Sequence, residues 1–509
     1  MGKKREERAK GHSPAGSGCN LDGGYTSPIK SFQDISAETL KNTLLSSRYV
    51  QLLLSLTVIG LILRFFNLGY NSLWLDEAST LTFASMSLPG IWEATTGGEF
   101  NPPLFYWTEH IMLLFGNSEV ILRFVPALLG VLTIPLVYVI GKEFYDRNVG
   151  IIAAAAVTFS PFLIFYSQEA RAYSMGLFLI VASLVFFLKA LKTNRISHWI
   201  LFGSLSALAF WSHFYTLVIT GSLVLYAFTV KISEFKKDIV SCKPLVLAGA
   251  TFILLSLPLI VVTVELFAKR TASAPTFGIE GAGIIIETFR QLSGFSEIVM
   301  YLFLLLFVIG IVQAFLTERN KGIFLVALTF LPFAISWFLS YRIPMMPRYL
   351  IILAPFFFIG IAMAYKPIYN LARSRWVVYG FMAMLVLLSV TTPFFMSYYS
   401  TYSKEDWRNF SKQVSQITTR GDLVVVAPGY IYQPFDYYYS NSTDGTYEFR
   451  ADNGETLESL RLQKGNNSMF VIMTSDISSA NPGGDAVAWI NQHTQLISQN
   501  TGIYLFKVS

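Results

Sequence analysis

The chain has 509 residues, of which 53% are hydrophobic and only 14% are charged. Soluble globular domains carry about 25% charged residues, so this composition excludes an ordinary soluble protein and predicts a membrane protein with many spans. The net charge of +6 does not indicate a nucleic-acid partner, because Lys and Arg in membrane proteins mainly set the orientation of the spans.

The predicted elements begin with a tail and continue as membrane spans. Residues 1–48 are polar and basic, and we expect them to form a disordered cytoplasmic tail held at the inner leaflet by charge. A span needs about 17–25 apolar residues. Within 49–396, the predicted transmembrane domain, that length gives about eleven candidates: 49–66, 119–140, 150–166, 174–191, 198–214, 215–231, 244–266, 298–316, 322–340, 349–366 and 376–396. The spans 198–214 and 215–231 almost abut, so a re-entrant pair is an alternative there.

The basic residues predict the orientation of these spans, because short cytoplasmic loops are enriched in Lys and Arg. A cytoplasmic N-terminus places Lys142, Lys192 and Lys321 in inner loops. The first outer loop, 67–118, has no Lys or Arg, and its charged residues are Asp76, Glu77, Glu93, Glu99 and Glu109. An odd number of spans then leaves residues 397–509 on the extracytoplasmic side.

Residues 397–509 differ in character from the spans. Runs rich in β-forming residues at 422–427, 469–473 and 502–507 alternate with helix-like stretches near 404–417 and 484–496. Strands that alternate with helices predict a small α/β domain with a partly parallel sheet. The predicted fold class is therefore an α-helical polytopic membrane protein with a small extracytoplasmic α/β domain at its C-terminal end.

Ionisable and polar side chains gather at the predicted outer ends of the spans, where such residues are costly and mark functional sites. The adjacent acids Asp76 and Glu77 follow the first span and are flanked by Trp74 and Leu75. The other candidates are Glu99, Asn101, Arg123, Glu169, Arg171, Tyr173, His213 and Arg348. Because every outer loop contributes, we expect these side chains to surround one extracytoplasmic cavity. Arg64, at the end of the first span, is expected to be a plain interfacial anchor.

Several segments together resemble the GT-C glycosyltransferases, in the branch of the prokaryotic protein O-mannosyltransferase-like and aminoarabinose-transferase-like enzymes. The similar segments are Ser72–Ala78, Asn101–Leu104, Arg123–Gly130, Ser160-Pro161 with Ser167–Tyr173, Arg348–Leu350 and Lys404–Arg408. The resemblance covers about 45–430 in the same order. It implies a GT-C membrane fold and the transfer of one sugar, with inversion, from a polyprenyl-phosphate carrier to an acceptor hydroxyl on the outer face.

The resemblance makes Asp76 the expected catalytic base, and we expect Glu77 to orient it or to hold a cation. An inverting transfer needs a carboxylate that accepts the proton of the attacking hydroxyl. Guanidinium groups bind phosphate bidentately, and the predicted phosphate-binding residues are Arg171, Arg348, Arg123 and Tyr173. The plainer alternatives are an acid pair that complements a helix dipole, snorkelling arginines and a tyrosine of the interfacial belt.

A divalent metal cation is the only cofactor considered, and no organic cofactor is predicted. The residues expected to contact substrate or such a metal are Glu99, Asn101, Glu169 and His213. Many members of the branch have His where this chain has Asn101, so the resemblance leaves the metal site open. Trp407 and Arg408 are expected to dock the C-terminal domain on the membrane part, and the alternative is that they close the cavity from above.

The predicted function is therefore that of a multi-pass membrane glycosyltransferase. Its partners would be a polyprenyl-phosphate-linked sugar, a glycan, lipid or protein acceptor, and the lipid bilayer. One alternative is a glycan polymerase or ligase that moves chains from a pyrophosphate carrier with a similar set of acids and arginines. A lipid or sugar transporter is less favoured, because the ionisable residues do not lie at mid-span in matching halves.

Overall fold

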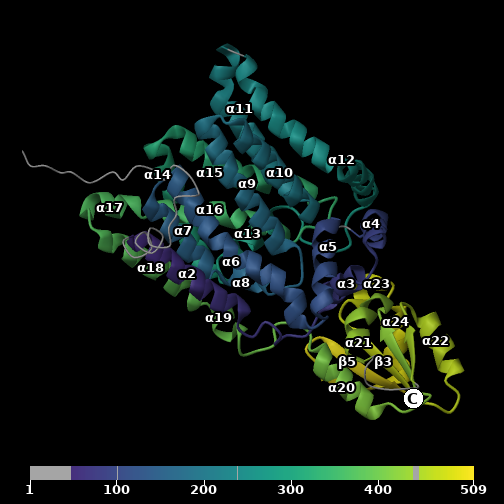
Figure 1. The fold of residues 1–509 in the computed structure, drawn as a ribbon. Coiled ribbons are helices and arrows are strands. Elements are labelled where there is room, and N and C mark those ends of the chain that lie inside the picture. The colour runs from purple at the N-terminus through teal and green to yellow at the C-terminus, as the bar shows by residue number, and fades with distance from the viewer. Residues whose placement is uncertain (1–46, 100, 238, 440–445) are drawn as a thin grey trace, which may run out of the picture. The chain divides into compact units, whose positions relative to one another are not determined.

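The computed structural model describes residues 47–99, 101–237, 239–439 and 446–509 (Figure 1). Most of the predicted tail, 1–46, lies outside these residues. The chain divides into two compact units, Met1–Gln51 and Leu52–Ser509, and the second contains both the apolar helices and a sheet domain. Helices up to residue 398 and a small sheet after residue 422 confirm the predicted fold class.

Seven helical runs among the described residues are long and apolar enough to cross a membrane. They are α2 (Arg48–Phe65), α6 (Glu119–Phe144), α9 (Tyr173–Thr193), α12 (Lys243–Thr271), α14 (Glu297–Thr317), α15 (Arg319–Leu339) and the run η4 (Pro347–Leu353), α16 (Ala354–Met363) and α17 (Lys366–Ala372). The pair α7 (Arg147–Phe159) and α8 (Pro161–Ser167) adds an eighth if it counts as one span. Three shorter apolar helices match the remaining predicted spans: α10 (Ile196–Ser212), α11 (Thr216–Lys237) and α18 (Arg375–Val390). Multiple spans are thus supported, while the count of eleven and the orientation stay predictions.

The predicted span 150–166 is not one straight helix, because α7 and α8 are bent by 58°. Ser160 lies between them with an extended backbone, and Pro161 begins α8. Proline favours an extended residue before it and is tolerated at the first helical position. The following turn, residues 168–172, is buried inside the protein and carries charged side chains.

Arg64 is fully buried, so the prediction that it is an interfacial anchor is wrong. Its guanidinium donates to the backbone oxygens of Val157 and Thr158 at 3.0 and 3.2 Å. These two residues belong to the last turn of α7, whose carbonyls lack helical partners before the bend. Arg64 therefore fastens α2 to the broken helix.

The segment 67–118, predicted as the first outer loop, is folded rather than irregular. It contains α3 (Leu75–Ala84), α4 (Leu88–Gly97), α5 (Pro103–Met112) and η2 (Leu113–Phe115). The remaining short helices that connect the apolar runs are η3 (Ile239–Cys242), α13 (Ala282–Leu292) and α19 (Pro393–Tyr398). Because α3 begins at Leu75, Asp76 and Glu77 lie in the first turn of a helix.

The C-terminal domain has a five-stranded mixed sheet in the order β2-β1-β3-β5-β4. Its strands are β1 (Leu423–Ala427), β2 (Tyr447–Arg450), β3 (Met469–Thr474), β4 (Thr494–Asn500) and β5 (Ile503–Val508). β1 pairs in parallel with β2 and β3, while β5 is antiparallel to β3 and β4. This pairing confirms the predicted partly parallel sheet.

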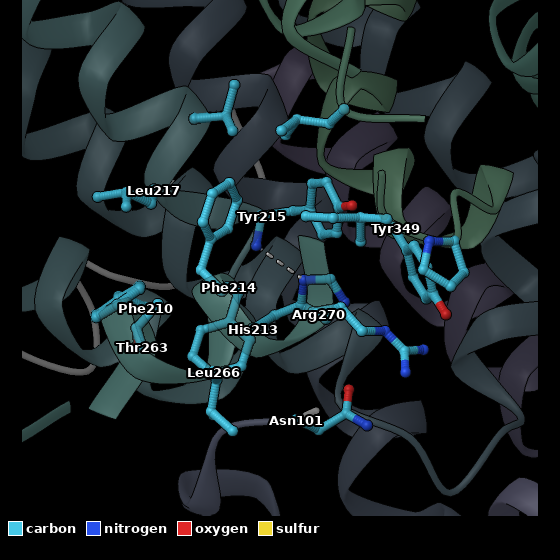
Figure 2. A pocket seen from close by; sticks show the side chains of 15 residues that line it. Asn101, Phe210, His213, Phe214, Tyr215, Leu217, Thr263, Leu266, Arg270 and Tyr349 are labelled. Carbon is cyan, nitrogen blue, oxygen red and sulfur yellow. Dashed lines mark hydrogen bonds between the residues drawn. The ribbon is translucent and has the colours of Figure 1, made fainter. Parts of the chain in front are cut away.

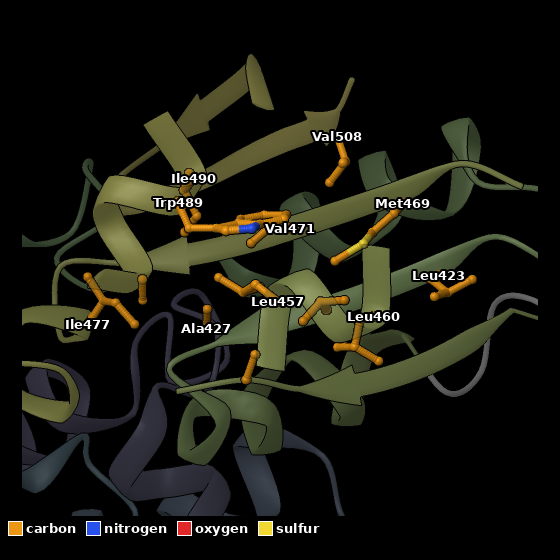
Figure 3. Close-up of a cluster of buried hydrophobic side chains, with 13 residues drawn as sticks. Leu423, Ala427, Leu457, Leu460, Met469, Val471, Ile477, Trp489, Ile490 and Val508 are labelled. Carbon is orange, nitrogen blue, oxygen red and sulfur yellow. The ribbon is translucent and has the colours of Figure 1, made fainter. Parts of the chain in front are cut away.

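Helices cover both faces of this sheet. The helices of the domain are α20 (Trp407–Ile417), η5 (Gly429–Ile431), α21 (Tyr432–Tyr439), α22 (Gly454–Gln463), α23 (Ile477–Ala480) and α24 (Asp485–His493). One core contains side chains of α22 and α24, such as Leu457 and Trp489, against Val425 and Val471 of the sheet (Figure 3). The other core contains side chains of α20 and α21 against the opposite face. The central strands β1, β3 and β5 therefore have apolar side chains on both faces of the sheet.

The central strands β1, β3 and β5 agree with the predicted β-rich runs, whereas β2 and β4 were missed. Both missed strands lie at the edges of the sheet, where most of their side chains are exposed or half-buried. An edge strand needs no continuous apolar run, so nothing in its composition marks it. The predicted helix 484–496 is also too long, because α24 ends at His493 and β4 begins at once.

Candidate active site

The two adjacent acids at the start of α3 face different surroundings. Neighbouring residues of an α-helix point about 100° apart. The side chain of Asp76 keeps 24% of its surface exposed, while that of Glu77 is fully buried. The pair therefore provides one acid that a ligand can reach and one that only the protein contacts.

Glu77 is held by three donors from distant parts of the chain. Arg123 of α6 donates from Nε to Oε1 at 2.8 Å and from Nη2 to Oε2 at 2.7 Å. The backbone N–H of Ala170 donates to Oε1 at 2.8 Å, and Lys404 Nζ lies 3.1 Å from Oε2. Burial alone would raise the pKa of Glu77, but the charges of Arg123 and Lys404 outweigh burial and lower it to about 2. Glu77 is thus an ionised structural acid.

Arg123 has no N–H group left for a ligand. Besides its contacts with Glu77, it donates to the backbone oxygens of Leu68, Asn71 and Ser72 at 2.9, 2.9 and 3.0 Å. A guanidinium has no other donors than these N–H groups. The contacts of Arg123 therefore do not support the predicted role in phosphate binding. They fasten the chain before α3 to Glu77.

Two other predicted arginines converge on Asp76. Its Oδ2 lies 3.9 Å from Nε of Arg171 and 3.5 Å from Nη2 of Arg348. Arg171 Nη1 also donates to the backbone oxygen of Asp76 at 3.1 Å. Arg171 precedes α9, and Arg348 lies in η4. The structure thus brings together three predicted site residues that are far apart in the sequence.

Buried donors beside Asp76 are without hydrogen-bond partners among the described residues. They are Nε of Arg348 and Nε1 of Trp74. The Arg348 guanidinium lies over the Trp74 ring, 5.4 Å from its centroid, and 5.7 Å from the centroid of Tyr349. Buried N–H groups are nearly always paired in folded proteins, so these two donors fit oxygen atoms of a ligand.

Glu169 is also buried, and its partner is a lysine of the C-terminal domain. Its Oε1 lies 3.3 Å from Lys404 Nζ, while its Oε2 has no partner among the described residues. Burial raises the pKa of Glu169, and Lys404 opposes that rise. Lys404 was missed as a site residue, although the segment that it begins, Lys404–Arg408, belongs to the resemblance.

Glu99 and Asn101 form a separate group with Tyr106 of α5. The Oε1 atom of Glu99 accepts hydrogen bonds from Asn101 Nδ2 and from the Tyr106 hydroxyl, the latter at 2.8 Å. Tyr106 packs with Ala172 in an apolar cluster beside the start of α9. Tyr106 was not predicted, because an aromatic residue in a helix carries no signal beyond the usual packing.

A largely apolar pocket of about 240 Å³ adjoins this group (Figure 2). His213, Tyr215 and Tyr349 line it, and Tyr215 and Tyr349 are stacked with ring centroids 5.4 Å apart. The backbone N–H of Tyr215 donates to Nδ1 of His213 at 3.3 Å. The other lining residues include Asn101, Phe210, Phe214, Leu217, Thr263, Leu266 and Arg270.

The predicted residue Tyr173 lies behind this pocket. Its ring centroid is 5.8 Å from that of His213 and 6.4 Å from that of Tyr349. Tyr349 lines the pocket, while the preceding residue, Arg348, faces Asp76. The pocket and the charged cluster are therefore neighbours that share the η4 segment.

The residues that were expected to contact a metal ion do not form a cluster of metal ligands in the described part of the chain. No group of three His, Cys, Asp or Glu side chains that could hold a metal ion occurs in the described ranges. Asp76 and Glu169 are instead paired with guanidinium and ammonium groups. The divalent cation stays a prediction.

The C-terminal domain docks on the chain just before α3. Arg408 donates to the backbone oxygen of Gly69 at 2.9 Å and to Glu119 Oε1 at 2.6 Å. Tyr438 donates to the same Glu119 oxygen at 2.6 Å. Trp407, by contrast, is fully buried in the core of the domain itself. Arg408 therefore makes the expected docking contact, and Trp407 supports the domain that carries it.

Parts of the chain are similar to known proteins. Residues 101–261 match the family described as dolichyl-phosphate-mannose-protein mannosyltransferase. An uncharacterized protein of Aquifex aeolicus (strain VF5) is 37% identical over 90 residues, which is 16% of this chain and 18% of that protein. The matched stretch is thus less than a fifth of that relative.

Solved structures are similar over nearly the whole chain. ArnT from Cupriavidus metallidurans in the apo state has a TM-score of 0.60 at 12% identity, covering 91% of this chain and 98% of ArnT. The structure of the same protein bound to undecaprenyl phosphate has a TM-score of 0.56 at 12% identity, covering 89% of this chain and 97% of ArnT. The oligosaccharyltransferase AglB from Archaeoglobus fulgidus, in complex with an inhibitory peptide and a dolichol-phosphate, has a TM-score of 0.53 at 12% identity. The match covers 92% of this chain and 75% of AglB.

The buried pair predicts an asymmetric loss of stability. We expect Arg123→Met to lower the free energy of unfolding by about 3–5 kcal/mol, because it leaves a buried carboxylate short of a partner. The double variant Arg123→Met, Glu77→Gln should lose less, because that carboxylate is gone. Thermal unfolding in detergent measures both. Lys269→Met, which breaks an exposed pair with Glu265, is the control and should leave the unfolding temperature unchanged; an equal loss in the single and double variants would contradict the prediction.

Proposed function

We propose that this membrane protein, which has the GT-C glycosyltransferase fold, transfers a single sugar from a polyprenyl-phosphate donor to an acceptor hydroxyl with inversion. Fold and family match together indicate a GT-C glycosyltransferase. The donor, the transfer of one sugar and the extracytoplasmic side of the membrane are the parts that we propose. The acceptor is a glycan, a lipid or a protein.

One observation carries the proposal: the accessible carboxylate of Asp76 lies within 4 Å of two guanidinium groups, Arg171 and Arg348. An inverting transfer needs a base for the proton of the attacking hydroxyl and an anion-binding group for the leaving phosphate. Asp76 supplies the base, because it is the acid of its pair that a ligand can reach. The arginines, which stay charged at any pH of interest, supply the anion-binding group.

In the proposed step the acceptor oxygen attacks the anomeric carbon while Asp76 takes its proton. The bond between that carbon and the phosphate oxygen breaks, and the polyprenyl phosphate leaves with the bonding electrons. Negative charge grows on the phosphate as the bond breaks, so contacts from Arg348 and Arg171 strengthen in the transition state. The Nε of Arg348, which has no hydrogen-bond partner in the described part of the chain, is available for such an oxygen.

The apolar pocket beside Arg348 suits the lipid part of the donor. It is lined by aromatic and aliphatic side chains, with Arg270 and His213 among its few polar residues. An isoprenoid next to a phosphate would place its chain on such a surface and its charge at the arginines. The structures of ArnT and AglB contain undecaprenyl phosphate and dolichol-phosphate, which are lipids of the proposed class.

The second candidate is a ligase that transfers whole glycans from a pyrophosphate carrier. It is favoured by the similarity to AglB, an oligosaccharyltransferase. A transporter has no comparable support from the fold. The divalent cation also remains a proposal, and adding Mg²⁺ or Mn²⁺ back to chelator-treated protein would test it.

Donor assays separate the two candidates. We expect the purified protein in liposomes to release polyprenyl monophosphate from a monophosphate-linked sugar, because one anionic group matches the two arginines at Asp76. The measurement is chromatography of the released lipid, with protein carrying Asp76→Asn as the background. Turnover only of a pyrophosphate-linked oligosaccharide would favour the ligase.

Asp76→Asn removes the proposed base but keeps the size of the side chain. We expect kcat to fall by about 10²–10⁴-fold, the usual contribution of general-base catalysis, while donor affinity falls little. Steady-state kinetics and donor binding by fluorescence measure the two effects. The matched control is Glu93→Gln, an exposed acid of the same outer loop. Full turnover by Asp76→Asn would remove Asp76 from the mechanism.

Arg348→Lys keeps the charge but loses the planar fork of donors. We expect the KM for the donor to rise about tenfold, because lysine does not reproduce bidentate phosphate contacts. The KM for the acceptor should change less. Arg342→Lys is the control, since Arg342 lies in the same loop and is exposed. An unchanged donor KM in Arg348→Lys would show that Arg348 does not bind the phosphate.

A further inference from the structure

Lys404 is a buried lysine that reaches from the C-terminal domain into the acid cluster. Its side chain is only 8% exposed, and its Nζ lies 3.1 Å from Glu77 Oε2 and 3.3 Å from Glu169 Oε1. The ammonium also lies over two aromatic rings, 5.7 Å from the centroid of Trp74 and 5.6 Å from that of Phe165. Lysine is rarely buried unless it is paired, so this position reflects specific contacts.

Glu169 depends on Lys404 more than Glu77 does. Glu77 has Arg123 and the Ala170 N–H as further partners, whereas Lys404 is the one ion-pair partner of the Glu169 carboxylate among the described residues. Removing one member of a buried pair leaves an uncompensated charge. Without Lys404, the buried carboxylate of Glu169 would lose its ion-pair partner, while that of Glu77 would keep Arg123.

The segment around Lys404 is fixed to the chain that leads into α3. Ser403 donates its backbone N–H to Asn71 Oδ1 at 3.0 Å. Ser72 Oγ donates to Asp406 Oδ1 at 3.2 Å and accepts from the backbone N–H of Arg408 at 3.2 Å. These contacts lie only a few residues before Asp76. Lys404 therefore lies in a segment that is bound to the chain directly before α3, and this segment places its ammonium beside Glu77 and Glu169.

We infer that Lys404 is a positioning residue for the transfer: it joins the C-terminal domain to Glu77 and Glu169, and so holds the first turn of α3 with Asp76 toward Arg171 and Arg348. The inference rests on the proposed function. Lys404 does not face Asp76 itself, and it acts through Glu77, the next residue of the same turn. The C-terminal domain is then a part of the active site.

The inference has a direction in pH. Glu77 faces Arg123, Lys404 and the Ala170 N–H, and Glu169 faces Lys404, Glu77, Arg348 and Asp76. Lys404 lowers the pKa of both glutamates, so its removal raises both. Glu77 binds Arg123 in its ionised form, and the arrangement of the cluster needs both glutamates ionised. When the pH is lowered, the two glutamates of a variant without Lys404 therefore become protonated at a higher pH than those of the native protein.

The test compares full-length Lys404→Met and Lys404→Arg with Lys412→Met, which changes an exposed lysine of α20. We expect Lys404→Met to lower kcat about 10- to 100-fold, the scale of a small misplacement of a catalytic group, with the donor KM nearly unchanged. The acid limb of its pH–rate profile should move to higher pH. Lys404→Arg should restore that limb and most of kcat, and Lys412→Met should match the native protein.

A merely structural role would give a different result. If the folded fraction of Lys404→Met has the native kcat and pH profile, the inference is overturned. Should that variant not fold, Lys404→Met with Glu169→Gln removes the unpaired carboxylate, and native kcat in this double variant would also overturn it. If the native protein transfers no sugar, the proposed function fails. In that case the pH dependence of thermal unfolding tests whether Lys404 pairs with Glu77 and Glu169. If this pH dependence is the same in Lys404→Met as in the native protein, the pairing is overturned.

Discussion

The buried ion pair between Glu77 and Arg123 is the interaction on which the rest of the site depends. Two charges without water are costly unless each hydrogen-bonding position is used, and here Arg123 uses all of its N–H groups. The pair joins α3, α6 and the chain before α3. The turn after the broken helix joins through the Ala170 N–H, and the C-terminal domain joins through Lys404. Three separate segments, which are α6, the turn 168–172 and the C-terminal domain, thus contact the carboxylate of one residue of α3.

Much of the fold could be predicted, because it follows from apolar length and periodicity. The spans are runs of apolar residues, and the central strands β1, β3 and β5 are short β-rich runs between turns. The parts that were missed lack such a signal. β2 and β4 are edge strands with exposed side chains, and the bend at Ser160-Pro161 lies inside a continuously apolar segment that reads as one span.

The candidate site could be located from the sequence but not resolved into roles. Charged residues beside the spans indicated Asp76, Arg171 and Arg348, and these three are in contact. The same rule could not distinguish Arg123, which binds backbone oxygens and a buried carboxylate, from Arg171 and Arg348. That distinction depends on which donors are already used, and hydrogen-bond partners come from segments far apart in the sequence. Lys404 was missed for the same reason, since its partners lie more than two hundred residues away.

The edges of the C-terminal sheet have a consequence for how the protein behaves at a crowded bilayer surface. Open strands can add a strand from another molecule, and proteins prevent this by shortening, charging or distorting them. β2 has only four residues and carries Glu448 and Arg450, while β4 shifts its register between Leu496 and Ser498. Neither border offers a long, regular row of backbone groups. Copies of the chain that diffuse side by side in the membrane are thereby discouraged from aggregating through their sheets.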